Sequence, residues 1–341
     1  MPNNPFQLAY ITLSTCLCGG NKIIFQHVQL LNKTGIKAVV ISKEDYPEWI
    51  DYQVPFLKVN SWEQAINKAD FFIATFYSLV LELWNFHKIR NRLIHFSQGF
   101  EIEYEEAKSF SSSILEAYDL PCPLWTISEN LTKKIKKNFP QKKIYTIGQP
   151  LDIKNFYPVK AKPPEPPIRL ILLGPLNISI KGIQFGLKCL KILKQECPFV
   201  EIIRISQVDT QEQEKDIICA EKYFTSLPPN QVGTLFRNSH ILFSPSLEGE
   251  GFGLPPLEAM ACGTATCLSA ISSYLSWDST KDYALFFEPL NIYDAVDKLK
   301  TLVNNRKIRD SISKRGLEVS KKFHPDSIAK QIYNFLQRFP A

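Results

Sequence analysis

The stretch SPSLEGEGFGLPPLEAMACG, residues 244–263, holds four of the 14 glycines of this 341-residue chain. The apolar residues 241–243 before it predict a strand, and the helix-forming residues 257–261 after it predict a helix. A glycine-rich turn between a strand and a helix presents backbone N–H groups at the positive end of that helix, which suits an anion. Gly249, Gly251 and Gly253 allow positive φ angles and a close approach of the main chain to a ligand. We therefore predict an anion-binding turn here.

Two glutamates make this turn unusual for a plain phosphate site. Glu250 lies in the turn itself, and Glu258 lies in the predicted helix. Ionised carboxylates accept strong hydrogen bonds from hydroxyl groups. The pattern therefore favours a ligand that carries phosphates and hydroxyls together, such as a nucleotide sugar.

Short apolar runs alternate with helical patterns in both halves of the chain, which is typical of βα units and parallel sheets. The segment YPVKAKPPEPPIRL (157–170) interrupts this alternation, and its prolines favour an extended linker. We predict an α/β protein with two Rossmann-like domains, residues 1–156 and 168–324, joined by a linker over 157–167. In such sheets ligands bind outside the carboxyl ends of the strands.

The composition argues against several classes of protein. A net charge of +6 suits a phosphorylated ligand or an anionic surface, but it is too small to indicate nucleic acid. The eight cysteines form no C-x-x-C pair, so we predict reduced, mostly buried thiols in a cytosolic protein and no metal site. The opening residues MPNNP do not resemble a signal peptide, and the apolar window 71–84 is too short to span a bilayer.

The wider stretch PSLEGEGFGLPPLEAMACGTATCLS (245–269) resembles the Glu-x7-Glu signature of the retaining GT-B glycosyltransferases of glycosyltransferase family 4. Three further segments resemble landmarks of that family: QPLDIKNFYP (149–158), LLGPLNISIKG (172–182) and CGGNKIIFQHVQLL (18–31). The resemblance covers most of the C-terminal half and only landmarks of the N-terminal half. It implies a GT-B fold, with two Rossmann-like domains facing across a cleft and a final helix, about 325–338, that packs back on the N-terminal domain.

The resemblance also implies roles for individual residues. Glu258 would hold the ribose hydroxyls of the donor, Glu250 would lie beside the transferred sugar, and Lys181 would stabilise the departing diphosphate. Gly19 and Gly20 would bring the main chain of the N-terminal domain close to the donor. The sugar and the phosphates would lie against four consecutive residues: Gly251, Phe252, Gly253 and Leu254.

At two places the sequence departs from the family pattern. Pro175 stands where the family has an arginine, and three residues are open as replacements for that cation: Asn177, Ser179 and Arg204. The second departure concerns a histidine that the family tends to have at the end of a central strand of the N-terminal domain. This chain has no histidine at the end of that strand.

Two residues of LIHFSQGFE (93–101) are candidates for that histidine position, His95 within the predicted strand and Gln98 at its end. Strand alternation turns His95 and Ser97 to one side, and Phe96 and Gln98 to the other. Gln98 is the better positional match. His95 stays a candidate, although a histidine within a strand is more often structural.

Together these features imply a glycosyltransferase of the hexosyltransferase type. It would move a sugar from a nucleoside-diphosphate sugar to a glycan or a lipid-linked acceptor, in the synthesis of a surface polysaccharide or glycolipid. Amides, a helix terminus and Lys181 can stabilise the leaving group without a metal or a cofactor, and no D-x-D motif occurs.

Three alternatives stay open. A degenerate GT-B protein that binds a nucleotide sugar without transferring it would fit the loss of the arginine at position 175. An epimerase could use the same fold. The sequence GEGFG also suggests an NAD-dependent oxidoreductase, but a dinucleotide fingerprint normally opens the first βα unit of a domain.

A run of six lysines between Lys133 and Lys143 has two interpretations. It is either a solvated helix face or a surface that attracts anionic lipid, which would place a cytoplasmic protein at the inner face of a membrane. The segment GFEIEYEEAKSF (99–110) lies where this fold builds its acceptor side.

Overall fold

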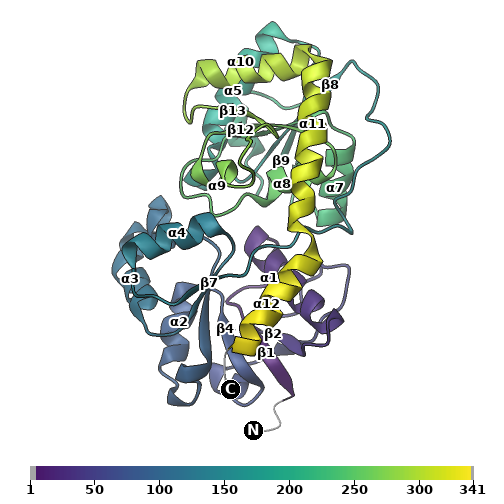
Figure 1. Cartoon of the computed structure of the whole chain (residues 1–341). Helices are drawn as coiled ribbons and strands as arrows, with labels where there is room; N and C mark the ends of the chain where they lie inside the picture. Colours follow the sequence, from purple (N-terminus) through teal and green to yellow (C-terminus); the bar gives the residue numbers. More distant parts are fainter. Residues whose placement is uncertain (1–4, 339–341) are drawn as a thin grey trace. The chain divides into compact units, whose positions relative to one another are not determined.

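The structure is a computed structural model, and it describes residues 5–338. The chain divides into two compact units (Figure 1). The described part of the first unit consists of residues 5–150 and 325–338, and the second unit consists of residues 151–324. Each unit is built around one parallel β-sheet.

The sheet of the first unit has its strands in the order β3-β2-β1-β4-β5-β6-β7, all parallel. The chain reverses its direction of progress between β1 and β4, and such a switch point is where doubly wound sheets bind ligands. The strands are β1 Phe6–Ile11, β2 Ala38–Ser42, β3 Phe56–Lys58, β4 Ala69–Ala74, β5 Leu93–Ser97, β6 Leu124–Thr126 and β7 Ile144–Thr146.

Helices flank this sheet and bury its central strands, of which β2 and β5 are buried along their whole length. The helices are α1 Gly19–Lys33, α2 Tyr77–Trp84, α3 Ser111–Asp119, α4 Glu129–Asn138 and α12 Pro325–Arg338. Four short 3-10 helices connect them: η1 Trp62–Ala65, η2 His87–Arg92, η3 Glu101–Glu103 and η4 Glu105–Phe110.

The sheet of the second unit has the order β10-β9-β8-β11-β12-β13, again all parallel, with its switch point between β8 and β11. The strands are β8 Ile168–Leu173, β9 Val200–Ser206, β10 Lys222–Thr225, β11 Ile241–Ser244, β12 Ala265–Ser269 and β13 Leu285–Phe287. The helices are α5 Ile183–Glu196, α6 Gln211–Glu214, α7 Pro229–Arg237, α8 Leu254–Ala261, α9 Ser272–Leu275, α10 Ile292–Asn304 and α11 Arg306–Ser320, with the 3-10 helices η5 Ser179–Lys181 and η6 Lys321–Phe323.

These two sheets confirm the prediction of an α/β protein with two Rossmann-like domains. The strand predicted within residues 93–101 is β5, and the apolar window 71–84 forms the end of β4 and α2. The sequence does not predict β3, because its three residues are only half-buried or exposed and are too few to show a periodic pattern. No helix among residues 5–338 is long and apolar enough to cross a membrane.

The junction between the two units lies between Pro150 and Leu151, ahead of the proline-rich stretch. Phe156 is buried and packs on Phe236 of α7, with 6.0 Å between the ring centroids. Arg237 Nη1 donates a hydrogen bond of 2.7 Å to the carbonyl of Asn155. These contacts hold residues 151–156 on α7, so the last residues of the predicted first domain pack in the second unit.

The final helix α12 belongs to the first unit, although it follows the second unit in the sequence. Phe335 is buried and packs edge-on against Trp125 of β6 and Tyr145 of β7, with centroid distances of 4.9 and 4.7 Å. Near the other end of the helix, Ile328 covers Gly148 so closely that a Cβ added there would lie 2.6 Å from its side chain. The helix thus closes the β6–β7 edge region of the first unit.

Replacing Phe335 with alanine should lower the free energy of unfolding of the first unit by about 3–5 kcal/mol, the usual cost of removing a buried phenylalanine. The control is Tyr333→Ala, because Tyr333 lies on the same helix with 52% of its surface exposed, and its loss should cost less than about 0.5 kcal/mol. Urea denaturation followed by tryptophan fluorescence measures both. Equal costs for the two variants would contradict the packing of α12 on β6 and β7.

Candidate active site

The glycine-rich turn lies at the carboxyl end of β11 and leads into α8. Gly249 and Gly253 both have positive φ angles, of 99° and 88°. Gly253 is the N-cap residue of α8 and offers no side chain to cap it. Its backbone lies directly on the ring of Tyr274, since a Cβ added at Gly253 would lie 2.2 Å from Cε1 of that ring. Conformation and space therefore both require glycine at position 253.

Lys181 and Glu250 come together at the switch point of the second sheet. Lys181 ends the 3-10 turn η5 that follows β8, and its Nζ lies 2.6 Å from Glu250 Oε2. The two side chains are partly shielded from solvent, with 30% and 11% of their surfaces exposed. The pair brings one cation and one carboxylate to a single point beside the start of α8.

The backbone packing of two turns brings this pair together. The amide of Leu247 donates to the carbonyl of Ile180 at 2.8 Å. Gly182 has a φ of 61°, and a Cβ added to it would lie 2.0 Å from the carbonyl oxygen of Pro245. The turn after β8 and the turn after β11 therefore touch, because these strands are neighbours in the sheet.

The other residues of the C-terminal half that are predicted to bind the sugar donor lie in or beside the same turn. Glu258 is on α8, one turn after Leu254, and only 6% of its surface is exposed. Phe252 is buried against Trp277 and Phe323, with centroid distances of 5.7 and 5.3 Å. Its side chain therefore anchors the turn, and only its backbone is left for a ligand.

Tyr274 of α9 packs against the turn. The sequence pattern does not predict this contact. Its hydroxyl lies 2.8 Å from Ser244 Oγ and 2.9 Å from Ser246 Oγ, while its ring meets Gly253. It thus contacts residues at both ends of the turn. Nothing in the spacing of SSYLSW (272–277) signals that role, which depends on where α9 packs.

In the first unit, Gly20 and Gln98 lie against each other. Gly19 and Gly20 begin α1, which is capped by Cys18, and Gln98 directly follows β5. Gln98 Nε2 donates to the carbonyl of Gly20 at 3.2 Å, and a Cβ added at Gly20 would lie 3.4 Å from that nitrogen. The structure therefore brings together these predicted residues of the N-terminal half.

His95 lies deeper in the first unit. It is fully buried, and neither ring nitrogen has a hydrogen-bond partner. Burial, helped by the charge of Lys142, lowers the pKa of His95 to about 3, so the ring is neutral. The predicted alternation along β5 is confirmed, because His95 and Ser97 both contact Tyr118 of α3.

Arg204 is not available as a replacement for the family arginine. It is fully buried on β9, and two of its nitrogens lie 2.9 Å from the carboxylate oxygens of Glu214. Its remaining donor bonds go to the carbonyls of Leu172 and Ile205. Two of the three replacements that the sequence leaves open therefore remain, Asn177 and Ser179. Both are exposed in the segment after β8.

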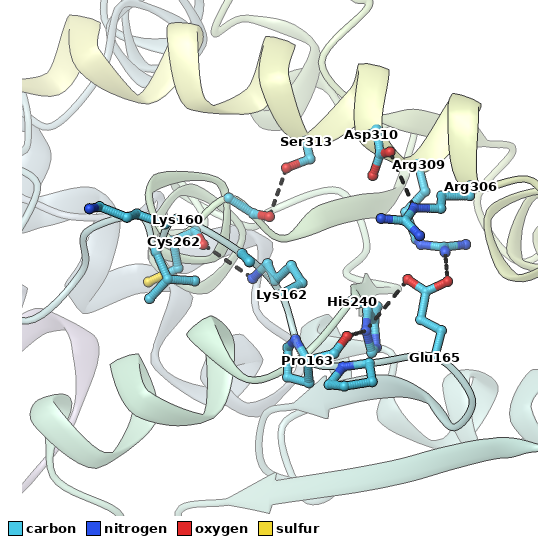
Figure 2. A pocket seen from close by; sticks show the side chains of 14 residues that line it. Lys160, Lys162, Pro163, Glu165, His240, Cys262, Arg306, Arg309, Asp310 and Ser313 are labelled. Atoms are coloured by element: carbon cyan, nitrogen blue, oxygen red, sulfur yellow. Dashed lines mark hydrogen bonds and ion pairs between the residues drawn. The ribbon is translucent and has the colours of Figure 1, made fainter.

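A cavity of about 440 Å³ lies elsewhere in the second unit, where the proline-rich stretch runs along α11 (Figure 2). Its polar walls are engaged by contacts within the protein. Lys162 Nζ donates to a group of oxygens at the carboxyl ends of α7 and α8 and just beyond: the carbonyls of Phe236, Arg237 and Cys262, and Thr264 Oγ1. Burial lowers the pKa of Lys162 to about 8.

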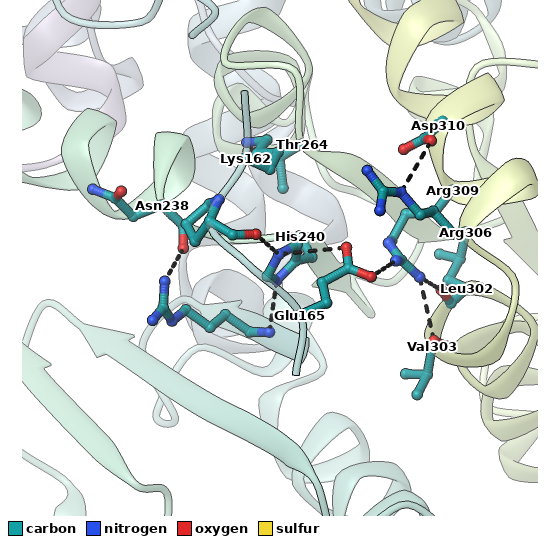
Figure 3. Close-up of polar contacts among 12 residues, drawn as sticks. Lys162, Glu165, Asn238, His240, Thr264, Leu302, Val303, Arg306, Arg309 and Asp310 are labelled. Carbon is teal, nitrogen blue, oxygen red and sulfur yellow. Dashed lines mark hydrogen bonds and ion pairs between the residues drawn. The ribbon is translucent and has the colours of Figure 1, made fainter. Parts of the chain in front are cut away.

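Glu165 ties the same stretch to α11. Its carboxylate pairs with Arg309 Nη2 at 2.5 Å and lies 3.6 Å from His240 Nε2 (Figure 3). His240 comes just before β11, so the cavity lies at the amino edge of the sheet, opposite the glycine-rich turn. These contacts anchor the proline-rich stretch to the second unit, and they do not form part of the candidate donor site.

A family model matches the part of the chain that contains Lys181 and the glycine-rich turn. Residues 159–319 match the model described as Glycosyl transferases group 1, which is just under half of the chain and includes Lys181, Glu250 and Glu258. Sulfoquinovosyl transferase SQD2 of Arabidopsis thaliana is 28% identical over 170 residues, which cover 47% of this chain and 32% of that protein. The chain thus spans about a third of the length of this curated relative.

Solved structures resemble the chain over nearly its whole length. Sucrose-phosphate synthase from Thermosynechococcus elongatus superposes with a TM-score of 0.79 over 98% of both chains, at 13% identity. Anabaena HepE in complex with UDP and glucose superposes with a TM-score of 0.77 over 97% of this chain and 99% of that one, at 12% identity. The fold is the two-domain GT-B fold that the resemblance predicts, and residues 159–319 carry the match to the family model. Membership in family 4 stays a prediction.

Gly253→Ala should be much more destabilising than Gly35→Ala, although both glycines have nearly the same φ, 88° and 86°. A Cβ at Gly35 meets nothing within 4 Å, so that variant should cost only the left-handed backbone strain, about 1–2 kcal/mol. Gly253→Ala should add about 1–3 kcal/mol for overpacking against Tyr274. Thermal unfolding of both variants measures this difference. Equal losses would mean that the turn does not rest on the ring of Tyr274.

Proposed function

We propose that this chain is a retaining glycosyltransferase that transfers a sugar from a nucleoside-diphosphate sugar to a glycan or a lipid-linked acceptor. The observation that carries the proposal is the 2.6 Å pair of Lys181 and Glu250 at the switch point, beside the start of α8. A cation and a carboxylate at one point match a ligand in which a diphosphate adjoins a sugar with hydroxyl groups.

The backbone N–H groups at the start of α8 also suit a diphosphate. The first N–H groups of a helix have no partner within it. In α8 the second and third residues are Pro255 and Pro256, which have no N–H. The free donors are thus confined to Gly253 and Leu254, next to Glu250. We infer that these amides and Lys181 bind the diphosphate, and that the Glu250 carboxylate accepts hydrogen bonds from the sugar.

In the proposed reaction the bond between the anomeric carbon and the diphosphate oxygen breaks, and negative charge develops on the leaving phosphate. In this proposal Lys181 and the amides at the start of α8 stabilise that charge electrostatically. The acceptor oxygen forms its bond on the same face of the sugar, and its proton passes to the leaving phosphate oxygen. These steps require neither a metal nor a cofactor.

Roles for the other predicted residues follow from their places. We propose that Glu258 binds the ribose hydroxyls, and that Gly19, Gly20 and Gln98 form the part of the site that the first unit supplies. Because His95 is fully buried, with a neutral ring, we leave it out of the proposed machinery. The HepE complex with UDP and glucose makes UDP the first nucleotide to test.

A degenerate protein that binds the nucleotide sugar without transferring it remains the second candidate. One observation favours it: Pro175 replaces the family arginine, while Arg204 is held by Glu214. Binding alone does not separate the two candidates, whereas release of a nucleoside diphosphate from the donor does.

The proposal predicts a thermal shift with one nucleoside diphosphate out of UDP, GDP, ADP and dTDP. At a hundred times its dissociation constant, such a ligand should add about 2.7 kcal/mol to the free energy of unfolding. Glu258→Gln should abolish most of that shift. The control Glu248→Gln should keep it, because Glu248 lies in the same turn but binds the amide and hydroxyl of Ser272.

A shift with NAD alone would contradict the glycosyltransferase assignment and favour an oxidoreductase. Once a base is identified, the corresponding sugar donors can be screened for turnover. Proton NMR of the first product formed then tests retention, since an α-linked donor must give an α-linked product.

We further propose a weak peripheral contact with anionic lipid through α4 and the residues after it. Three of the six lysines in the run are exposed, and their side chains make no hydrogen bond or ion pair among the described residues: Lys133, Lys137 and Lys143. Lys134 pairs with Glu103 at 2.8 Å, Lys136 donates to the carbonyl of Lys142, and Lys142 is buried.

Sedimentation with phosphatidylserine vesicles at low salt should recover part of the protein, because each free lysine contributes about 1 kcal/mol near such a surface. The double variant Lys133→Glu/Lys137→Glu should lose this binding. The matched variant Lys188→Glu/Lys191→Glu changes two exposed lysines of α5 and should retain it. Equal binding of the two double variants would overturn the assignment to α4.

A further inference from the structure

A cluster of buried oxygen atoms lies beneath the turn that follows β5. The hydroxyl of Tyr118 on α3 lies 2.6 Å from Glu101 Oε2, 2.7 Å from Ser97 Oγ and 3.0 Å from the carbonyl oxygen of Gly99. Ser97 Oγ lies 2.7 Å from the same carbonyl. This cluster holds the short segment between the end of β5 and η3, and that segment carries Gln98.

The segment has little freedom to move independently of the cluster. A Cβ added at Gly99 would lie 1.7 Å from the hydroxyl of Tyr104, so the main chain is enclosed on that side as well. The amides of Glu103 and Tyr104 close the following turn on the carbonyls of Phe100 and Glu101, both at 3.0 Å. A change in the bonding of the Gly99 carbonyl is therefore passed to its neighbour Gln98, whose amide meets Gly20.

Glu101 is an unusual member of such a cluster, because it is a buried acid without a cationic partner. Only 6% of its surface is exposed, and no ion pair joins it to a lysine or arginine among residues 5–338. Burial raises the pKa of Glu101 from 4.5 to about 7, against the opposing effect of the Tyr118 hydrogen bond. The carboxyl therefore changes charge near neutral pH.

Several other titratable groups lie around Glu101. Tyr118 from α3 and Tyr77 from α2 face it, and burial raises the pKa of both phenols. Tyr104 lies over Gly99. His95 of β5 packs on the ring of Tyr118, and its pKa is lowered to about 3. Glu103 on the same 3-10 turn pairs with Lys134 outside the cluster.

Counting protons shows how Glu101 acts on the turn. Four contacts join the cluster, but with ionised Glu101 only the hydroxyls of Tyr118 and Ser97 can donate. Tyr118 then donates to the carboxylate, since a hydrogen bond to a charged acceptor is the stronger one, and Gly99 keeps a single donor, Ser97. With neutral Glu101 the acid donates to Tyr118, and the Tyr118 proton becomes available to the Gly99 carbonyl.

We propose that Glu101 is a positioning residue that acts through Tyr118 on the Gly99 carbonyl and so fixes Gln98 against Gly20. In its neutral form Glu101 gives Gly99 a second donor and holds the turn more firmly. In its ionised form Glu101 accepts the hydrogen bond of the Tyr118 hydroxyl. The Gly99 carbonyl then keeps one donor, and the turn is held less firmly. The inference rests on the proposed function only insofar as Gln98 belongs to the site.

The test is an NMR titration of the Gln98 side-chain amide between pH 5 and pH 9, with the signals assigned by Gln98→Glu. The wild-type signals should shift with a midpoint near pH 7, because they follow Glu101. Glu101→Gln cannot ionise and should abolish this titration. Tyr118→Phe keeps the buried acid but breaks the link, so it should also abolish it. Glu103→Gln is the control on the same 3-10 turn and should titrate as the wild type does.

A wild-type Gln98 signal that does not titrate would overturn the proposal, and so would one that titrates unchanged in Tyr118→Phe. A second measurement uses the pH dependence of unfolding. Because the folded state raises the pKa of Glu101, the acid favours the fold below its ordinary value of 4.5, and this stability is lost as the pH rises to about 7. Glu101→Gln should remove that fall, and an unchanged profile would contradict a neutral buried acid.

The outcome is independent of the nucleotide experiments. If no nucleoside diphosphate binds, the proposed function fails while the titration of Gln98 still tests the cluster. If a nucleotide binds and the titration is absent, only the positioning role of Glu101 is lost. With a donor in hand, Glu101→Gln should flatten the pH profile of kcat near neutrality and leave the KM for the donor unchanged.

Discussion

The contact between two turns at the switch point of the second sheet is the constraint on which the candidate site depends. Gly182 packs against the carbonyl of Pro245, with no room for a side chain between them. Because β8 and β11 are neighbours in the sheet, this contact fixes the turns after both strands at once. Lys181 and Glu250, one from each turn, lie 2.6 Å apart.

Buried polar groups hold the surrounding turns in place. Tyr274 contacts both ends of the glycine-rich turn, Arg204 of β9 pairs with Glu214, and Lys162 holds the proline-rich stretch. Each of these groups finds several partners, as a buried polar group must if its desolvation is to be offset. Glu101 is also buried, with the Tyr118 hydroxyl as its partner, and burial raises its pKa to about 7.

Local features of the site were predictable from the sequence. The glycines at 249 and 253, the helix after the turn and the strand before it follow from residue types and their spacing. The alternation along β5 correctly turned His95 and Ser97 toward one side. The role of Arg204 was not predictable, because a buried arginine and an exposed one look alike in a strand pattern. Its partner Glu214 lies ten residues away on a different element.

The sequence by itself determined the two parallel sheets and the glycine-rich turn with its glutamates between a strand and a helix. These depend on neighbours along the chain, through periodicity, glycine conformation and helix capping. Only the tertiary structure decided which distant residues meet: Lys181 with Glu250, 69 positions apart, Tyr274 with Ser244, and Glu101 with Tyr118. The physical reason is that parallel strands need a crossover between them, so side chains adjacent at one sheet edge come from segments well separated in the sequence.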